Sequence, residues 1–220
     1  MSKRIMLVHA FLPSMAPTVT AFRAGWPEAE VLNLVDESVY ADVTPEGVMK
    51  PGVAERVTSL LNQAVQGGAA GIVFTGSTFG PAVDKARQAI AVPVLKADEA
   101  MAEQAVTQGR RILIACTAAR AVPVVRANME AAAQQAGKQP LIDGFAVPGA
   151  KAAIAAGDDA LHDRLIADWV EKNHHDYDVI ALGQISMVPS RELLSPGAAA
   201  KVICSPDATV ARMRALLDIR

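Results

Sequence analysis

The chain has 220 residues, of which 51% are hydrophobic, enough for one substantial core or two smaller ones. Its 21 Lys and Arg nearly balance its 23 Asp and Glu, so the net charge of -2 favours neither nucleic acid nor an acidic membrane as a partner. This charge balance favours a small-molecule ligand. The two cysteines, Cys116 and Cys204, are too few and too far apart for a disulfide framework, which favours a reducing, cytoplasmic compartment.

Short runs rich in Val and Ile alternate with stretches of helical period, the pattern of βα units that build a parallel sheet. The first run, Arg4–His9, leads into Pro13 without the small-residue cleavage site of a secretion signal, and we interpret it as a strand. No apolar run approaches the roughly 20 residues needed to cross a bilayer. The predicted strands are Arg4–His9, 31–35, Gly71–Thr75, 93–96, Arg111–Cys116, 178–183 and 201–204.

Two of the intervening segments have an apolar stripe and predict helices that cover a sheet. The first stripe is Val53, Val57, Leu60, Leu61 and Ala64. The second is Leu161, Leu165 and Trp169, in a helix that opens at Asp158. The second stripe leaves His162 and Asp163 at the surface or in an interface, so we expect no catalytic dyad there.

The chain also contains an internal repeat. RIMLVHA at Arg4 is similar to RILIACT at Arg111, and GIVFTGSTF at Gly71 is similar to DVIALGQIS at Asp178. Both pairs are 107 residues apart (111 − 4 and 178 − 71), and PVLKADEA in the first half matches KVICSPDA in the second at nearly the same offset. Matches in the same order indicate a duplication.

A duplication predicts where a ligand would bind. In open α/β sheets ligands bind outside the carboxyl ends of the strands, so two similar halves facing each other would hold a site in the crevice between them. The candidate residues follow matching strands: His9 against Cys116 and Thr117, and Gly76, Ser77 and Thr78 against Gln184 and Ser186.

The strand-end segments FTGSTFG and LGQISM resemble those of the aspartate/glutamate racemase superfamily. This group includes glutamate, aspartate and hydantoin racemases, maleate isomerases and arylmalonate decarboxylases. The resemblance extends over VHAFLPSMAPTVTAF, AVPVLKADEAMAEQAV, ALHDRLIADWV and CSPDATVARMRALL, nearly the whole chain. It implies an α/β fold of two pseudo-symmetric Rossmann-like domains with parallel sheets, residues 1–96 plus 206–220 and residues 97–205, with no cofactor and a homodimeric assembly.

Racemases of this superfamily have a cysteine after each of two equivalent strands; one takes the α-proton and the other returns it on the opposite face. The resemblance places Gly76 and Gln184 at these two catalytic positions. Neither side chain can abstract a proton, so the two-thiol mechanism is absent. Arylmalonate decarboxylases share the glycine but keep one cysteine. Three interpretations stay open: a different chemistry, a binding protein, or Gly76 as an altered cysteine.

A set of hydroxyl side chains predicts a cradle for a substrate carboxylate. Ser77 and Thr78 lie where a strand gives way to a helix, so their hydroxyls and the first free N–H groups suit an anion. Thr117 and Ser186 offer similar donors from the second half. Each hydroxyl alone is as consistent with a helix cap, but their convergence on one crevice favours binding.

His9 ends the first strand and is our first choice for the acid/base group. The alternative is a buried histidine that is hydrogen-bonded to a neighbouring loop. Cys116, at the equivalent place in the second half, is either a displaced thiol beside the substrate or an apolar filler, and we expect Cys204 to be inert.

No metal site is expected, because the adjacent His174 and His175 point in different directions. The expected function is a cofactor-independent racemase, isomerase or decarboxylase that acts on a small carboxylate through a carbanion or enolate. A catalytically inactive relative that binds such an acid is the first alternative. A nucleotide-binding protein is the second, although the chain has no Gly-x-Gly-x-x-Gly after a strand.

Overall fold

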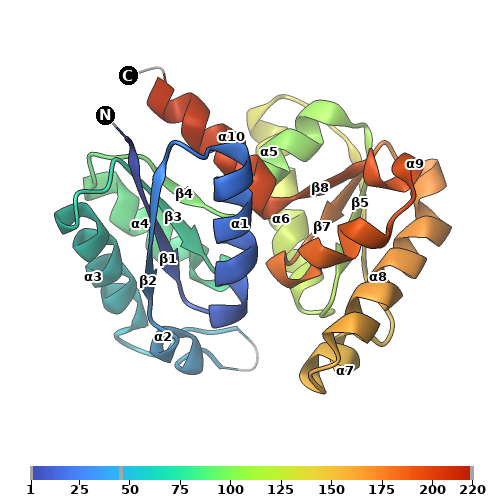
Figure 1. Ribbon diagram of the computed structural model, residues 1–220, viewed down its shortest axis with the longest axis horizontal. Coiled ribbons are helices and arrows are strands. Elements are labelled where there is room, and N and C mark those ends of the chain that lie inside the picture. The colour runs from blue at the N-terminus through green and yellow to red at the C-terminus, as the bar shows by residue number, and fades with distance from the viewer. Residues whose placement is uncertain (1, 45–46, 219–220) are drawn as a thin grey trace. The chain divides into compact units, whose positions relative to one another are not determined.

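The computed structural model describes residues 2–44 and 47–218. The chain divides into two compact units, Met1–Ala100 together with Thr209–Arg220, and Met101–Ala208. Each unit has a four-stranded parallel sheet with helices packed against it (Figure 1).

The sheet of the first unit has the strand order β2-β1-β3-β4. These strands are, in chain order, β1 Arg4–His9, β2 Glu30–Val35, β3 Gly71–Thr75 and β4 Val94–Lys96. The helical segments are η1 Leu12–Ser14, α1 Met15–Gly25, α2 Ser38–Ala41, α3 Val53–Gln66, η2 Ser77–Phe79, α4 Gly80–Ala86 and η3 Arg87–Ala89. Every residue of β3 is buried, as expected for a parallel strand covered on both faces.

The sheet of the second unit has the order β6-β5-β7-β8. Its strands are β5 Arg111–Cys116, β6 Leu141–Ala146, β7 Val179–Leu182 and β8 Val202–Cys204. The helical segments are α6 Ala121–Gln135, α7 Ala150–Ala155, α8 Asp159–Asn173, η4 His174–Asp176, η5 Ile185–Leu193 and α9 Pro196–Ala199. Helices α5 Glu99–Gln108 and α10 Ser205–Asp218 each contain one of the two boundaries between the units.

The two sheets share one topology. Strands β1 and β5 hold the second place in their sheets, β3 and β7 the third, and β4 and β8 one edge. These are the strand pairs that the internal repeat matched, so the prediction of a duplicated, parallel α/β fold is confirmed.

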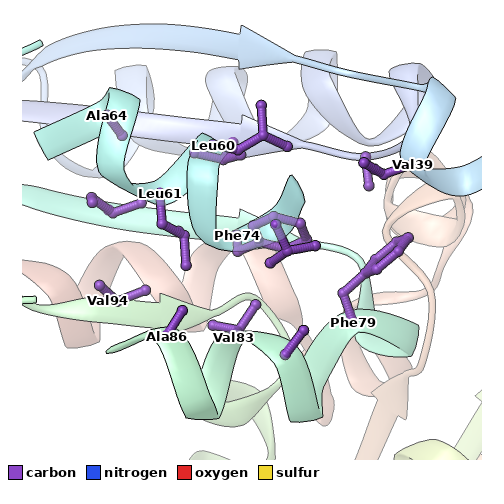
Figure 2. Packing of buried hydrophobic residues seen from close by; sticks show 14 of the residues in the cluster. Val39, Leu60, Leu61, Ala64, Phe74, Phe79, Val83, Ala86 and Val94 are labelled. Atoms are coloured by element: carbon purple, nitrogen blue, oxygen red, sulfur yellow. The ribbon is translucent and has the colours of Figure 1, made fainter. Parts of the chain in front are cut away.

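The core on one face of the first sheet shows why the first apolar stripe forms a helix. Figure 2 shows side chains of α3 and α4 packed over Phe74 and Val94, and the ring of Phe79 lies edge-on to Phe74 at a centroid distance of 5.8 Å. Burying one such large apolar side chain contributes about 1.5–3 kcal/mol. The predicted stripe Val53, Val57, Leu60, Leu61 and Ala64 is buried here throughout.

The second predicted stripe was right only in part: Leu165 and Trp169 are partly buried against the core of the second unit, but the centre of the buried face lies one residue further along the helix. Helix α8 begins as expected after Asp158, whose side chain accepts a hydrogen bond from the Leu161 N–H. It buries His162, Ile166, Ala167 and Val170, while Leu161 is 37% exposed. The stripe is turned by one residue, about 100° around the helix, so His162 is in the interior and not at the surface.

Strand β6 is the strand of the second sheet that was not predicted from the sequence. It lies at the sheet edge and its residues alternate between exposed and half-buried, so it lacks the continuous apolar run of the other strands. Gly144 lies at its centre because a Cβ there would come 2.7 Å from Val122 Cγ1 of α6. The close packing of α6 therefore requires a glycine inside this strand, although glycine is more common in turns.

None of the described helices combines the length and the apolar character that a membrane crossing requires.

Candidate functional site

The carboxyl end of the first sheet holds a buried network around His9. Its Nδ1 atom lies 2.8 Å from the Thr75 hydroxyl on β3, its direct partner in the strand ladder. Its Nε2 atom lies 3.1 Å from the side-chain oxygen of Asn33 on β2. The Ser14 hydroxyl, at the start of α1, lies 2.8 Å from that of Thr75. The network therefore connects β1, β2, β3 and the start of α1.

Both ring nitrogens of His9 have partners, and the side chain is fully buried. Burial lowers the pKa of His9, because desolvation disfavours the charged ring, although the hydrogen bond to Asn33 opposes this. Geometry thus favours the alternative interpretation, a buried structural histidine, over our first choice of an acid/base group.

Gly76 directly follows β3 and has a backbone that other residues rarely adopt. Its φ is +145°, a region that carries strain for any residue with a Cβ. A Cβ at this position would also lie 3.0 Å from the Phe79 ring. A thiol at position 76 therefore requires the backbone to change, and Gly76 is consistent with this backbone as it stands.

The predicted cradle residues of the first unit follow at once. Ser77 and Thr78 occupy the first two positions of η2, whose N-cap is Gly76. Ser77 is exposed and Thr78 is half-buried. Neither hydroxyl is at the N-cap position where side chains cap helices, so the capping interpretation loses its main support for these two residues.

At the carboxyl end of the second sheet, Cys116 points into protein and not into solvent. It is fully buried, and a Cβ on Gly183 would lie 2.6 Å from its sulfur, so the end of β7 is packed directly on the thiol. Burial raises the pKa of Cys116 to about 12. The geometry favours the apolar filler over a displaced thiol that contacts substrate. Cys204 is also buried, with a pKa raised to about 11 by burial.

Gln184 has a fixed orientation at the end of β7. Its side-chain oxygen accepts a hydrogen bond from the Ala118 N–H at 3.0 Å. Because the carbonyl end of the carboxamide is occupied, the NH₂ end is what Gln184 offers to another group. Ser186 lies two residues further on, half-buried in the first turn of η5.

Thr117 follows β5 and contacts a histidine that the sequence reading did not place in the site. Its hydroxyl lies 3.1 Å from His162 Nε2, and His162 Nδ1 lies 3.0 Å from the Asp163 carboxylate. His162 is 1% exposed and Thr117 is 4% exposed. The expectation that His162 lies at the surface or in an interface was wrong; the signal that would have placed it in the interior is the i, i+4, i+8 spacing of His162, Ile166 and Val170.

Within residues 2–44 and 47–218, no three His, Cys, Asp or Glu side chains gather as metal ligands would.

The match to a family is extensive. The family model described as Asp/Glu/Hydantoin racemase matches residues 16–213, most of the chain. The chain belongs to the Asp/Glu/hydantoin racemase family. No curated protein sequence matches it.

Solved structures of other proteins share the fold of this family member. An allantoin racemase from Klebsiella pneumoniae has a TM-score of 0.77 at 18% identity, over 99% of this chain and 89% of that one. A glutamate racemase from Bacillus anthracis has 0.68 at 15%, over 99% and 82%. An unliganded arylmalonate decarboxylase has 0.60 at 19%, over 98% and 93%. At identities this low, these similarities establish a common fold alone.

Proposed function

We propose that this member of the racemase family is a cofactor-independent enzyme that acts on a small carboxylate through a carbanion or enolate intermediate. In racemases, isomerases and decarboxylases that form such an intermediate, the protein must stabilise the negative charge that develops on the substrate. The reaction differs from the two-thiol one, because Gly76 and Gln184 stand at the expected thiol positions.

The orientation of Gln184 supports this proposal most directly. With its oxygen held by the Ala118 N–H, its NH₂ group is a preorganised donor at the carboxyl end of β7. A neutral donor cannot take a proton from carbon, but it can bind the oxygen of an enolate. Removing one such donor typically costs about 10²–10³ in rate.

The proposed substrate contacts in the first unit are Ser77 and Thr78. Both hydroxyls lie at the beginning of η2, next to the end of β3, and one of them is exposed. A carboxylate could take hydrogen bonds from them. Thr117 and Ser186 are the proposed substrate contacts of the second unit.

A second candidate function, a carboxylate-binding protein without catalysis, is favoured by the state of the thiols. Both cysteines are buried, and burial raises the pKa of Cys116 to about 12 and that of Cys204 to about 11. Neither is a thiolate at neutral pH, so neither replaces the missing bases.

One experiment separates the two candidates. Protein is incubated in heavy water with malonates, 2-substituted malonates, aspartate and related 2-substituted acids. Deuterium at the α-carbon is followed by mass spectrometry, CO₂ release is measured in parallel, and the melting temperature is recorded with each acid and with NAD. Turnover of any acid supports the enzyme. A rise in melting temperature with no turnover supports the binding protein, and a rise only with NAD contradicts both.

A further inference from the structure

Thr117, His162 and Asp163 form a chain of contacts at the carboxyl end of the second sheet. The hydroxyl, the imidazole and the carboxylate lie in that order, with distances of 3.1 Å and 3.0 Å. Thr117 and His162 are both almost completely buried, and the Asp163 side chain is 18% exposed. The second unit alone supplies all of these groups.

The chemistry of the partners places the protons. An ionised carboxylate only accepts hydrogen bonds, so the proton between Asp163 and His162 resides on Nδ1. In a neutral imidazole Nε2 then has a free lone pair, and the Thr117 hydroxyl donates to it. The carboxylate thereby selects one tautomer of His162, and the proton of Thr117 is directed at His162 Nε2.

His9, the buried histidine at the end of β1 in the first unit, has an amide oxygen where His162 has a carboxylate. Its Nε2 atom donates to the side-chain oxygen of Asn33, and its Nδ1 atom faces the Thr75 hydroxyl. Neither nitrogen faces a carboxylate in these contacts. Of these two histidines, His162 is the one whose adjacent carboxylate can stabilise the imidazolium that forms when Nε2 takes a proton.

We propose that Thr117 is the catalytic hydroxyl of this protein, and that His162 and Asp163 are positioning residues that make it a proton carrier. The proposal rests on the proposed function, to which it adds the missing acid/base group. A hydroxyl within hydrogen-bond reach of a base, which is itself oriented by a third group, is the general arrangement for activating a weak acid.

Proton transfer through this chain balances without a cofactor. The C–H bond at the α-carbon breaks as Thr117 Oγ takes that proton, and the former hydroxyl proton moves to His162 Nε2. The electron pair stays on the substrate as an enolate, which the Gln184 NH₂ group can bind. His162 becomes an imidazolium next to the Asp163 carboxylate. Once the hydroxyl proton of Thr117 has exchanged with solvent, the reverse sequence returns a solvent proton to carbon.

A single hydroxyl exchanges protons with one face of the substrate. The relay therefore supports exchange of the α-proton with retained configuration. With His162 as the imidazolium, whose Nε2 proton replaces the one that Thr117 gives up, it also supports protonation of one face after CO₂ has left. It does not support interconversion of enantiomers, which needs a second group on the other face.

The test compares variants of the full chain in the heavy-water and CO₂ assays. Thr117→Val and His162→Gln should lower kcat by about 10²–10⁴ with little change in KM, and Thr117→Ser should retain most of it. His174→Gln is the matched control, because His174 is also a buried histidine of the second unit, 8% exposed, and lies outside the relay. Equal losses in His174→Gln, or full activity in Thr117→Val, would overturn the proposal.

A spectroscopic readout separates this proposal from the proposed function. Long-range ¹H–¹⁵N correlation of the imidazole rings, assigned by the signal missing in His162→Gln, should show His162 as the Nδ1–H tautomer. Thr117→Val should shift the Nε2 resonance. An Nε2–H tautomer would overturn the relay, whatever the activity. The Nδ1–H tautomer in a protein that turns over no acid would support the relay geometry and overturn the proposed enzyme.

Discussion

The side-chain oxygen of Gln184 accepts a hydrogen bond from the backbone N–H of Ala118, at 3.0 Å. This bond links the segment after β7 to the segment after β5, two strands that are neighbours in the sheet. It also decides which end of the carboxamide is available for a ligand, and the first prediction concerns it.

Replacing Gln184 by Met keeps the length of the side chain but removes the acceptor for Ala118. We expect Gln184→Met to lower the free energy of unfolding by about 0.5–1.5 kcal/mol, because a partly buried N–H loses its partner. Gln184→Glu keeps an acceptor and should be close to the parent in stability, while its charge weakens carboxylate binding. Urea unfolding measures the change in stability. The rise in melting temperature on addition of the bound carboxylic acid measures the change in affinity. Equal stability of all three proteins would show that the bond contributes nothing.

Gly76→Ala should be strongly destabilising, since its φ of +145° is unfavourable for any residue with a Cβ. The expected loss is about 1–3 kcal/mol of unfolding free energy. Gly197→Ala is the control, because Gly197 lies in α9 with no atom within 4 Å of its Cβ position. That change should stabilise by roughly 0.5–1 kcal/mol. A neutral Gly76→Ala would mean that this backbone relaxes freely, and would restore the interpretation of Gly76 as an altered cysteine.

Thiols at the two expected positions should create racemisation that the parent lacks. Gly76→Cys should add or increase α-proton exchange on a bound carboxylate, at the cost of the strain described above. Adding Gln184→Cys should be required before both enantiomers interconvert. General acid–base assistance is typically worth about 10²–10⁴-fold, so the gain should be measurable. Chiral chromatography of products from heavy water measures it, and racemisation by the parent at the rate of the double variant would contradict the assignment of these positions.

The Ser77→Ala, Thr78→Ala double variant tests the proposed cradle. If both hydroxyls donate to a carboxylate, its affinity should fall by about 1–3 kcal/mol. Ser59→Ala, an exposed serine of α3, serves as the control and should bind as the parent does. Isothermal titration with the acid that stabilises the parent most gives the values, and unchanged affinity in the double variant would remove Ser77 and Thr78 from the site.

Stability should fall as the pH drops below about 6.5, the ordinary pKa of histidine. Burial lowers the pKa of His9 in the folded state, so the unfolded chain takes up a proton first, and stability decreases from the ordinary pKa down to the folded one. The pKa of His174 is lowered in the same direction, mainly by burial. Urea unfolding at several pH values gives the unfolding free energy as a function of pH. Its slope should be shallower for His9→Gln than for the parent, and shallower still when His174→Gln is added. A parent slope unchanged in both variants would exclude these histidines as its source.

The strands could be predicted wherever they are buried on both faces. β3 and β5 are continuous apolar runs for that reason, and their predicted bounds match the structure. Strand β6 could not be predicted in the same way. It lies at an edge, and Asp143 and Gly144 within it are residue types common in turns.

An ambiguity in the sequence of α8 changed which of its residues were predicted to lie in the site. Both Leu161 and Ile166 are apolar, so the sequence of α8 permits two stripes one residue apart. The core of the second unit buries Ile166 and Val170 completely and Leu165 and Trp169 only in part. His162 entered the interior with Ile166 and Val170, and the choice between the two phases depends on packing that acts between segments distant in the chain.

The sequence by itself determined the duplicated α/β fold and the residues that follow each strand, because apolar periodicity and repeated segments are properties of the chain order. Only the tertiary structure decided which side chains meet at those positions. Thr117 and His162 are 45 residues apart, and their contact requires both the register of β5 and the rotation of α8. A hydrogen bond requires its two atoms to be placed to within a few tenths of an ångström. A pattern of apolar residues locates a helix face only to within about 100°, which is too coarse to predict such a contact.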